Sequence, residues 1–117
     1  MASRRGPTPA GWYPKRGDVC LVMLGKERPV VVISSDLLNR HSLDICVVPV
    51  STAEHKAFSL RPHLRAGEGG LARNSWVKCD QVTTVEKKLV LYPRLGAISE
   101  ASLGRIESAI KQALELN

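Results

Sequence analysis

The chain has 117 residues, which is enough for one domain with a hydrophobic core and too few for two. Its 44% hydrophobic and 24% charged residues are ordinary for a soluble globular protein. Lys and Arg outnumber Asp and Glu by 17 to 11, giving a net charge of +6. This excess favours a polyanionic partner, although many small proteins are basic without such a role.

The sequence has no membrane-spanning or secretory segment, which bears on where in the cell the protein is expected. No apolar run approaches the roughly 20 residues that cross a bilayer, and no apolar stretch follows Arg4 and Arg5 as a secretory signal requires. Cys20, Cys46 and Cys79 form no paired motif and are expected to be reduced, buried thiols. These features predict a cytoplasmic protein with no membrane association.

The first half of the chain predicts a flexible start followed by a β-hairpin. Residues 1–14 contain three prolines and two glycines without periodicity, so we expect a flexible tail before a single domain at 15–117. Asp18 to Leu24 is almost continuously apolar and predicts a strand covered on both faces. Arg28 to Ile33 predicts a second strand, joined to the first by a turn at residues 25–27.

Further short strands are predicted along the middle of the chain. Ser34 to Asp36 is expected to cap a helical turn that ends at Asn39. Pro49 lies near the end of the third predicted strand, Leu43 to Val50, and suggests that this strand lies at a sheet edge or terminates near Pro49. The remaining predicted strands are Leu43 to Val50, Ala57 to Leu60, Ser75 to Cys79 and Leu89 to Tyr92. Strands so closely spaced predict a compact antiparallel barrel or sandwich.

The C-terminal segment has helical periodicity. Its apolar residues recur at steps of three and four, with Ser99 placed as N-cap and Ile98 placed to contact Leu103 across the first turn. The stripe consists of Leu103, Ile106, Ile110 and Leu114. The whole chain is therefore predicted to be mainly β (α+β), with an antiparallel barrel closed by a C-terminal amphipathic helix.

Several familiar sites are absent from the sequence. There is no phosphate-binding glycine loop, no HExxH motif and no Cys or His pair at metal-ligand spacing. His41, His55 and His63 are scattered through polar stretches, where a solvated loop residue is more common than a ligand. We therefore expect neither a metal nor another cofactor.

Polar residues at the ends of apolar strands are the remaining candidates for chemistry. Arg28 opens the second predicted strand, Ser51 and Thr52 follow the third, and Asp80 and Gln81 follow the run that begins at Ser75. Strand ends hold side chains on a rigid frame, as a site requires. Read alone, each of these residues more commonly marks a simple transition from core to surface.

Five motifs in one order resemble the MazF/PemK family of toxin–antitoxin toxins. They are Arg16-Gly17-Asp18-Val19, Arg28-Pro29-Val30-Val31-Val32-Ile33, Val48-Pro49-Val50-Ser51-Thr52, Ser75-Trp76-Val77-Lys78-Cys79-Asp80-Gln81-Val82-Thr83-Thr84 and Leu95-Gly96. Each motif is weak alone, but together they extend the resemblance from about residue 15 to residue 116.

The resemblance implies an SH3-like barrel that forms a homodimer and cleaves single-stranded messenger RNA at short sequences, which inhibits translation and growth. It implies metal-independent attack by the RNA 2′-hydroxyl, leaving a 2′,3′-cyclic phosphate and a 5′-hydroxyl. It also implies a cognate antitoxin, whose acidic, disordered tail would complement the basic toxin.

Residue roles follow from the same resemblance. Arg28 matches the catalytic arginine of the family, and Ser51 matches its catalytic Thr or Ser, with Thr52 adjacent as a substitute. Asp80 occupies a position that some relatives use in acid–base catalysis. Candidate contacts to RNA are Lys26, Arg73, Trp76, Lys78 and Gln81, and further backbone contacts are expected from Lys87 and Lys88. Trp76 can also be a core residue, which is the commoner role for such a position.

Two departures from the family and two alternative functions stay open. The loop at residues 25–27 is shorter than in many relatives and supplies no catalytic histidine, and Lys78 stands where some members have Arg. The same fold also resembles toxins that poison DNA gyrase without catalysis. A nucleic-acid-binding module that has lost its activity is the third possibility.

Overall fold

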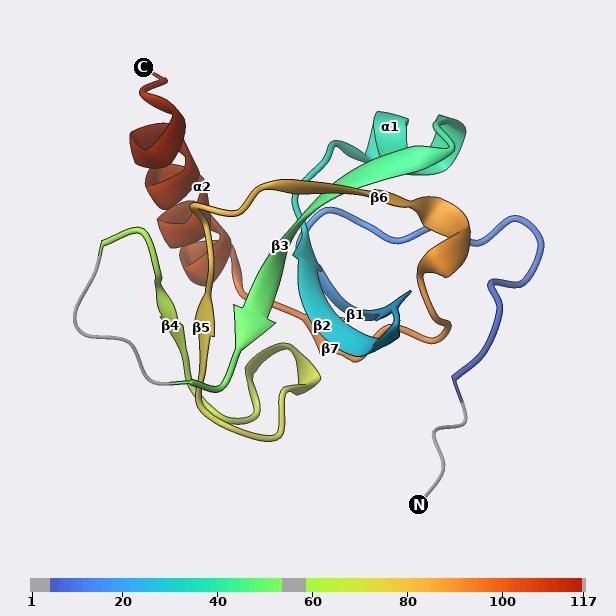
Figure 1. Cartoon of the computed structure of the whole chain (residues 1–117), viewed down its shortest axis with the longest axis horizontal. Helices are drawn as coiled ribbons and strands as arrows, with labels where there is room; N and C mark the ends of the chain where they lie inside the picture. The colour runs from blue at the N-terminus through green and yellow to red at the C-terminus, as the bar shows by residue number, and fades with distance from the viewer. Residues whose placement is uncertain (1–4, 54–58, 117) are drawn as a thin grey trace.

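The computed structural model describes residues 5–53 and 59–116. The strands are β1 (Asp18–Leu24), β2 (Lys26–Val32), β3 (Asp44–Ser51), β4 (His63–Leu64), β5 (Ser75–Val77), β6 (Thr83–Glu86) and β7 (Gly96–Ala97). The helices are α1 (Asp36–His41) and α2 (Glu100–Leu114), with the 3-10 helices η1 (Glu68–Gly70) and η2 (Lys87–Leu89). The strands form one bent antiparallel sheet in the order β4-β5-β3-β2-β1-β7, with β6 added beside β3 (Figure 1). This half-barrel with a C-terminal helix confirms the predicted fold class.

The β1–β2 hairpin has a tighter turn than the sequence suggested. Leu24 pairs with Lys26, so Gly25 alone joins the two strands, and its φ of 81° lies in the left-handed region that favours glycine. The prediction that the turn includes residues 26 and 27 is wrong, because both residues belong to β2. Strand β2 therefore begins at Lys26, two residues closer to the tip of the hairpin than the predicted start at Arg28.

Strand β3 lies in the interior of the sheet. It pairs with β2 along one edge, and along the other it pairs first with β6 and then with β5. Pro49 lies where the partner changes, and its carbonyl oxygen accepts a hydrogen bond from the Lys78 backbone N–H at 2.8 Å. Because the neighbouring strand changes at this point, the missing N–H of proline breaks no continuous ladder. The expectation that Pro49 marks an edge or a strand end is therefore wrong.

Other strand boundaries also differ from the predictions. The third strand is shifted by one residue and includes Ser51. Of the predicted strand at 57–60, residues 57 and 58 lie outside the described residues, and Ser59 and Leu60 form a turn. The segment predicted as Leu89 to Tyr92 makes only two isolated bridges, because η2 occupies its start. Strand β5 is shorter than predicted, and β6 and β7 had no clear sequence signal.

Two apolar clusters cover opposite faces of the sheet. Because neighbouring side chains of a strand point to opposite faces, Val31 packs in the cluster under α2 while Val30 packs in the other. The first cluster is closed by Ile106 and Ala109 of α2. In β1, Val19 packs in the first cluster and Val22 in the second, which confirms a strand covered on both faces over residues 18–22. The last two residues of the strand, Met23 and Leu24, are exposed, so the prediction is wrong there.

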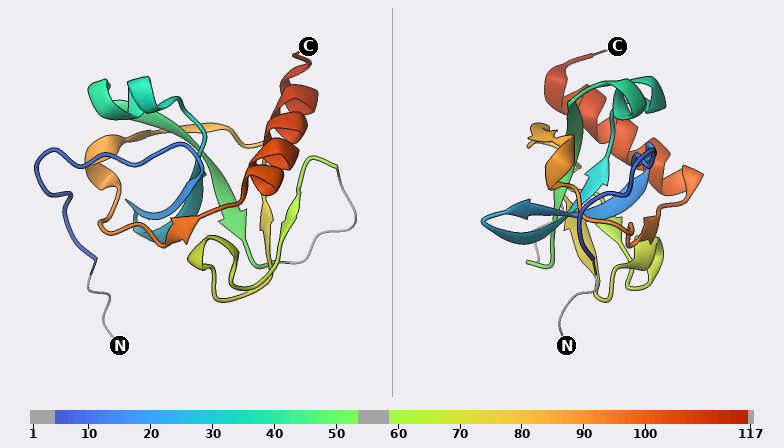
Figure 2. Two further views of the ribbon diagram at one scale, coloured as in Figure 1. Left: turned by 180° about the vertical axis from the view of Figure 1, so that it is seen from behind. Right: turned by 90° about the vertical axis from the view of Figure 1, so that its right-hand side faces the viewer.

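Helix α2 confirms the predicted amphipathic helix. Ser99 is its N-cap, and the Ser99 hydroxyl accepts a hydrogen bond from the Ser102 N–H at 3.1 Å. Ile106 is fully buried against the sheet, whereas Leu114 near the end of the helix is exposed. Figure 2 shows α2 lying along one side of the sheet, away from α1 and β6. No helix within the described ranges 5–53 and 59–116 is long and apolar enough to cross a bilayer.

The N-terminal segment contacts the barrel over its described part. Gly6 and Tyr92 exchange two backbone hydrogen bonds of 2.9 and 2.8 Å. The rings of Trp12 and Tyr92 lie 5.2 Å apart, and Trp12 packs against the cluster on the face opposite α2. Trp12 of this segment thus lies on an apolar surface, and the flexible tail at residues 1–14 stays a prediction. The domain boundary at residue 15 stays a prediction.

Candidate functional site

Strand register places four polar or aromatic side chains in one row across the sheet. Trp76 of β5 lies opposite His63 of β4 on one side and opposite Ser51 of β3 on the other. Strands β2 and β3 pair Val30 with Pro49, and two further residues along each strand bring Arg28 level with Ser51. Residues directly opposite each other on paired strands point to the same face, so the row shares one face of the sheet.

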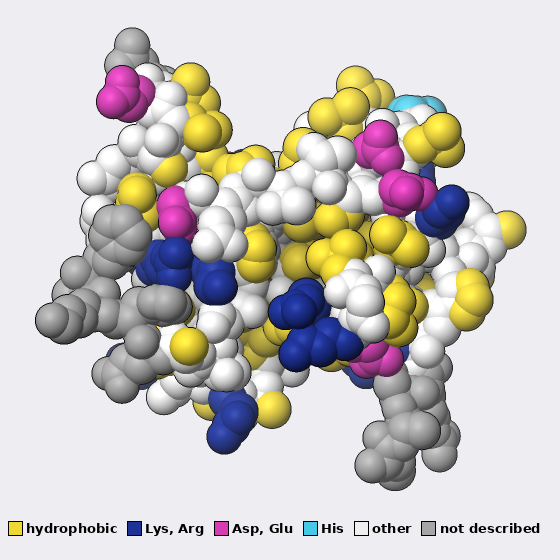
Figure 3. Space-filling view, in the orientation of Figure 1, with side chains coloured by type: hydrophobic (Ala, Val, Ile, Leu, Met, Phe, Trp, Pro, Cys, Tyr) yellow, Lys and Arg dark blue, Asp and Glu magenta, His cyan; other side chains and the backbone are white. Residues whose placement is uncertain are grey.

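A cavity of about 260 Å³ opens where β2, β3 and the end of β5 meet. Three cationic side chains, Lys26, Arg28 and Lys78, line it together with the hydroxyl residue Ser51. The complete lining is Lys26, Glu27, Arg28, Pro29, Pro49, Val50, Ser51 and Lys78. On the face shown in Figure 3, dark-blue Lys and Arg side chains lie over the β1–β2 hairpin and, separately, toward β4 and β5. The cavity is therefore a basic recess of a size that suits a phosphate group.

Arg28 presents an unengaged guanidinium to this cavity. The side chain is exposed, and no carboxylate among the described residues pairs with it. Arg16 and Arg94 differ, since they hold Glu107 and Asp18 respectively. A planar fork of N–H donors that no described carboxylate holds suits a bound oxyanion.

The Ser51 hydroxyl accepts one hydrogen bond and donates none to another described residue. Its Oγ accepts a hydrogen bond from the Ala53 backbone N–H at 3.1 Å, which leaves the hydroxyl proton for donation to a ligand. Thr52 is exposed and does not line the cavity. Of the two hydroxyl candidates, the structure brings only Ser51 to the cavity.

Asp80 is engaged by a neighbouring arginine rather than by the cavity. Arg61 donates from Nε to Oδ1 and from Nη2 to Oδ2 of Asp80, both at 3.1 Å. Hydrogen bonding from Arg61 holds the pKa of the Asp80 carboxyl below its usual range, and the positive charge of Lys78 acts in the same direction. Asp80 is therefore an ionised carboxylate beside the cavity and not part of its lining.

The other candidate contacts are dispersed. Arg73 and Gln81 are exposed and lie outside the cavity lining. Lys87 Nζ donates to the backbone oxygens of Asn39 and Arg40 at 3.0 and 3.1 Å, where it caps the end of α1. Lys88 pairs with Glu86 at 3.1 Å. The structure does not bring these four residues to the basic recess.

The histidines and cysteines differ in their surroundings. His41 is exposed at the end of α1, His55 lies outside the described residues, and His63 is half-buried in β4 rather than in a solvated loop. Burial raises the pKa of the Cys20 and Cys79 thiols to about 12, so both stay protonated at neutral pH. Within residues 5–53 and 59–116 no three His, Cys, Asp or Glu residues group as metal ligands would.

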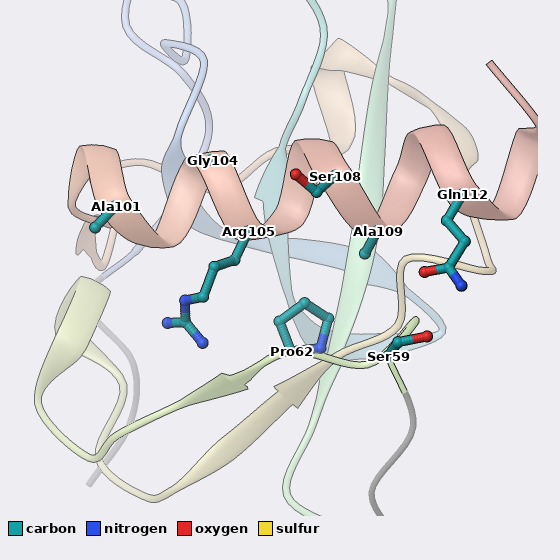
Figure 4. Close-up of a pocket in the computed structure, with 8 residues that line it drawn as sticks. All are labelled: Ser59, Pro62, Ala101, Gly104, Arg105, Ser108, Ala109 and Gln112. Carbon is teal, nitrogen blue, oxygen red and sulfur yellow. The ribbon is translucent and has the colours of Figure 1, made fainter. Parts of the chain in front are cut away.

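A larger cavity, of about 680 Å³, runs along α2 and has a different chemical character. Figure 4 shows Arg105 extending from α2 toward β4, and its Nη1 donates to the His63 backbone oxygen at 3.1 Å. The lining is otherwise small or uncharged: Ser59, Pro62, Ala101, Gly104, Ser108, Ala109 and Gln112. Arg105 is the one charged residue of this lining, and no described acid or base lines the cavity to activate the Ser59 or Ser108 hydroxyl, so it is a poorer candidate for chemistry.

Comparisons with known proteins agree on one family. The family model for PemK-like, MazF-like toxins of type II toxin–antitoxin systems matches residues 15–114. The chain is 30% identical over 95 residues to endoribonuclease MazF9 of Mycobacterium tuberculosis, covering 77% of this chain and 80% of that protein. It is 29% identical over 112 residues to endoribonuclease EndoA of Bacillus subtilis, covering 87% and 95%. A mycobacterial endoribonuclease solved in complex with its cognate antitoxin matches with a TM-score of 0.79 at 26% identity, covering 89% and 97%.

Proposed function

Because the chain belongs to the PemK-like, MazF-like family of type II toxins, we propose that it is an endoribonuclease that cleaves single-stranded RNA without a metal ion. The observation that carries the proposal is the convergence of Arg28, Ser51 and Lys78 on one recess. A guanidinium that no described carboxylate holds, a hydroxyl with its proton available and an ammonium group together suit a phosphate in an RNA backbone.

The proposed reaction is an intramolecular transesterification. The 2′-oxygen of one ribose attacks the adjacent phosphorus, its proton passes to a base, and the bond from phosphorus to the 5′-oxygen breaks. The 5′-oxygen takes up a proton, so the products are a 2′,3′-cyclic phosphate and a 5′-hydroxyl. Negative charge grows on the two non-bridging oxygens of the phosphorane, and donors that face these oxygens lower the barrier.

Each lining residue has a distinct proposed role. Arg28 donates its fork of N–H groups to the phosphorane oxygens, a geometry that Lys does not reproduce. Ser51 donates its hydroxyl proton to a phosphate oxygen, and Lys26 and Lys78 supply positive charge to the RNA backbone. Asp80 acts through its neighbours, because its carboxylate holds Arg61 and attracts Lys78 on the same face.

The products of cleavage test this chemistry directly. Wild-type protein is incubated in EDTA with single-stranded RNA of mixed sequence, and the new termini are identified by mass spectrometry. We expect cyclic-phosphate and 5′-hydroxyl ends, and no cleavage where a 2′-deoxyribose replaces the attacking ribose. Cleavage that requires an added divalent ion, or that leaves 5′-phosphate ends, would refute the mechanism.

We further propose that the active protein is a homodimer held inactive by a cognate antitoxin. The support is the complex formed by the mycobacterial relative and the +6 charge of this chain, which would attract an acidic tail. The antitoxin is expected to copurify from the native host as a small acidic protein and to suppress RNA cleavage when added back.

A further inference from the structure

The row that contains Ser51 continues into an aromatic pair that the proposed chemistry does not use. The rings of Trp76 and His63 lie 5.1 Å apart with an interplanar angle of 42°. They stand directly opposite each other on β5 and β4, and Trp76 also stands opposite Ser51. The ladder therefore fixes an indole one strand away from the proposed catalytic hydroxyl.

Trp76 does not serve the core in the way that Trp12 does. Trp12 packs against the apolar cluster on the face opposite α2, whereas neither cluster includes Trp76 among its packed residues. Both Trp76 and His63 are half-buried. Since a half-buried indole on a sheet surface gains less from burial than a core indole, its position calls for another explanation.

The distance along the row suits RNA. Neighbouring strands are about 4.8 Å apart, so Trp76 lies about one spacing from Ser51 and about two from Arg28. Proteins that hold single-stranded nucleic acid combine a basic track for the backbone with aromatic rings for the bases. The recess supplies the basic track, with Lys78 two residues beyond Trp76 and on the same face.

We propose that Trp76 and His63 form a nucleobase subsite, in which the indole stacks on the base next to the cleaved phosphate and His63 positions the indole. This inference rests on the proposed ribonuclease function and adds to it a second contact that fixes the register of the RNA. His63 contacts Trp76 rather than the reacting atoms, so it is a positioning residue. A second copy of the chain covering the pair is the competing explanation.

Tryptophan fluorescence tests the subsite. The chain has two tryptophans, and Trp12→Phe leaves Trp76 as the only indole while keeping an aromatic ring beside Tyr92. The probe is a short RNA that carries the mapped cleavage site with 2′-O-methyl at the attacking ribose, so that it binds without being cut. Stacking is expected to quench the Trp76 emission at saturation, and removal of the flanking base is expected to abolish the quenching.

Affinities measured with the same probe separate stacking from structural damage. Removing the flanking base from the RNA should weaken its binding to wild type about tenfold. Trp76→Ala should weaken binding of the complete RNA by the same factor, and this variant should bind the RNA with and without the base equally well. His63→Ala should weaken binding in part and His63→Phe should restore it, because the contact depends on the ring. His41→Ala is the matched control and should bind normally.

The outcomes are distinct for the two proposals. Wild-type protein that cuts no RNA overturns the ribonuclease function and the subsite together. Two results would overturn the subsite alone, provided that wild type cleaves RNA normally. One is Trp76 emission that RNA does not quench, and the other is an equal loss of affinity on base removal in wild type and in Trp76→Ala. Trp76 emission that responds to protein concentration instead of RNA would assign the pair to a contact between two copies.

Discussion

At the scale of single residues, the site depends on which polar groups are already engaged within the protein. Arg16, Arg61 and Arg94 hold carboxylates, and their positive charges are compensated locally. Arg28 has no such partner among the described residues and lines the recess. A guanidinium that already holds a carboxylate would have to release it before binding phosphate. Arg28 needs no such exchange and lines the recess, which supports the catalytic role proposed for it.

The hydroxyl of residue 51 should matter more than the size of its side chain. Ser51→Ala is expected to lower the single-turnover cleavage rate about 100-fold, because one donor to the phosphorane is lost. Ser51→Thr should retain most of the rate, since it restores the hydroxyl and suits a strand. A Ser51→Thr protein as inactive as Ser51→Ala, with both variants folded by circular dichroism, would contradict this role.

The Arg61–Asp80 pair should stabilise the fold in a pH-dependent way. The pKa of Asp80 is lowered in the folded state, so its contribution is present above the unfolded value of about 3.9 and is lost as pH falls through the folded pKa. Asp80→Asn should therefore be less stable than wild type in urea at pH 7, and the two proteins should converge toward pH 2. A gap of constant size would show that the charge of Asp80 does not contribute.

At the level of helices and strands, the sequence predicted elements that have a periodic apolar pattern. It missed short strands that form only because a strand distant in sequence pairs with them. Helix α2 was predictable because Leu103, Ile106 and Ile110 recur at helical spacing over several turns. Strands β4 and β7 have two residues each, too few for a periodic pattern, and they exist because β5 and β1 pair with them. His63 was missed for this reason, since its place beside Trp76 is set by that pairing.

Two glycine positions give a matched pair of stability predictions. A Cβ on Gly96 would lie 2.6 Å from the Gly69 carbonyl carbon, where η1 crosses β7, whereas a Cβ on Gly104 meets nothing within 4 Å. Gly96→Ala should therefore destabilise the protein by about 1–3 kcal/mol in urea unfolding. Gly104→Ala should stabilise it by about 0.5–1 kcal/mol, because Ala is the better helix former. Equal effects of the two changes would show that the crossing of η1 and β7 relaxes freely.

At the scale of the whole molecule, ordered motifs were more informative than composition. A charge of +6 only favoured a polyanionic partner. The motifs at residues 16–19, 28–33, 48–52, 75–84 and 95–96 together indicated the family and the fold, and the family match over residues 15–114 confirms that identification. The residues themselves could not predict that Asp80 is held by Arg61 outside the recess, because Arg61 belongs to no motif and meets Asp80 only through the pairing beside β5.

In the proposed function, Arg28 of the basic recess catalyses metal-free RNA cleavage. The most direct measurement compares the single-turnover rates of wild type, Arg28→Ala and Arg40→Ala on one RNA in EDTA, where Arg40 is an exposed arginine of α1. We predict a loss of about 100- to 1,000-fold for Arg28→Ala and an unchanged rate for Arg40→Ala. Equal rates for all three proteins would contradict the role of Arg28. Intact RNA with all three, together with inhibition of DNA supercoiling by gyrase, would show a non-catalytic toxin of the same fold.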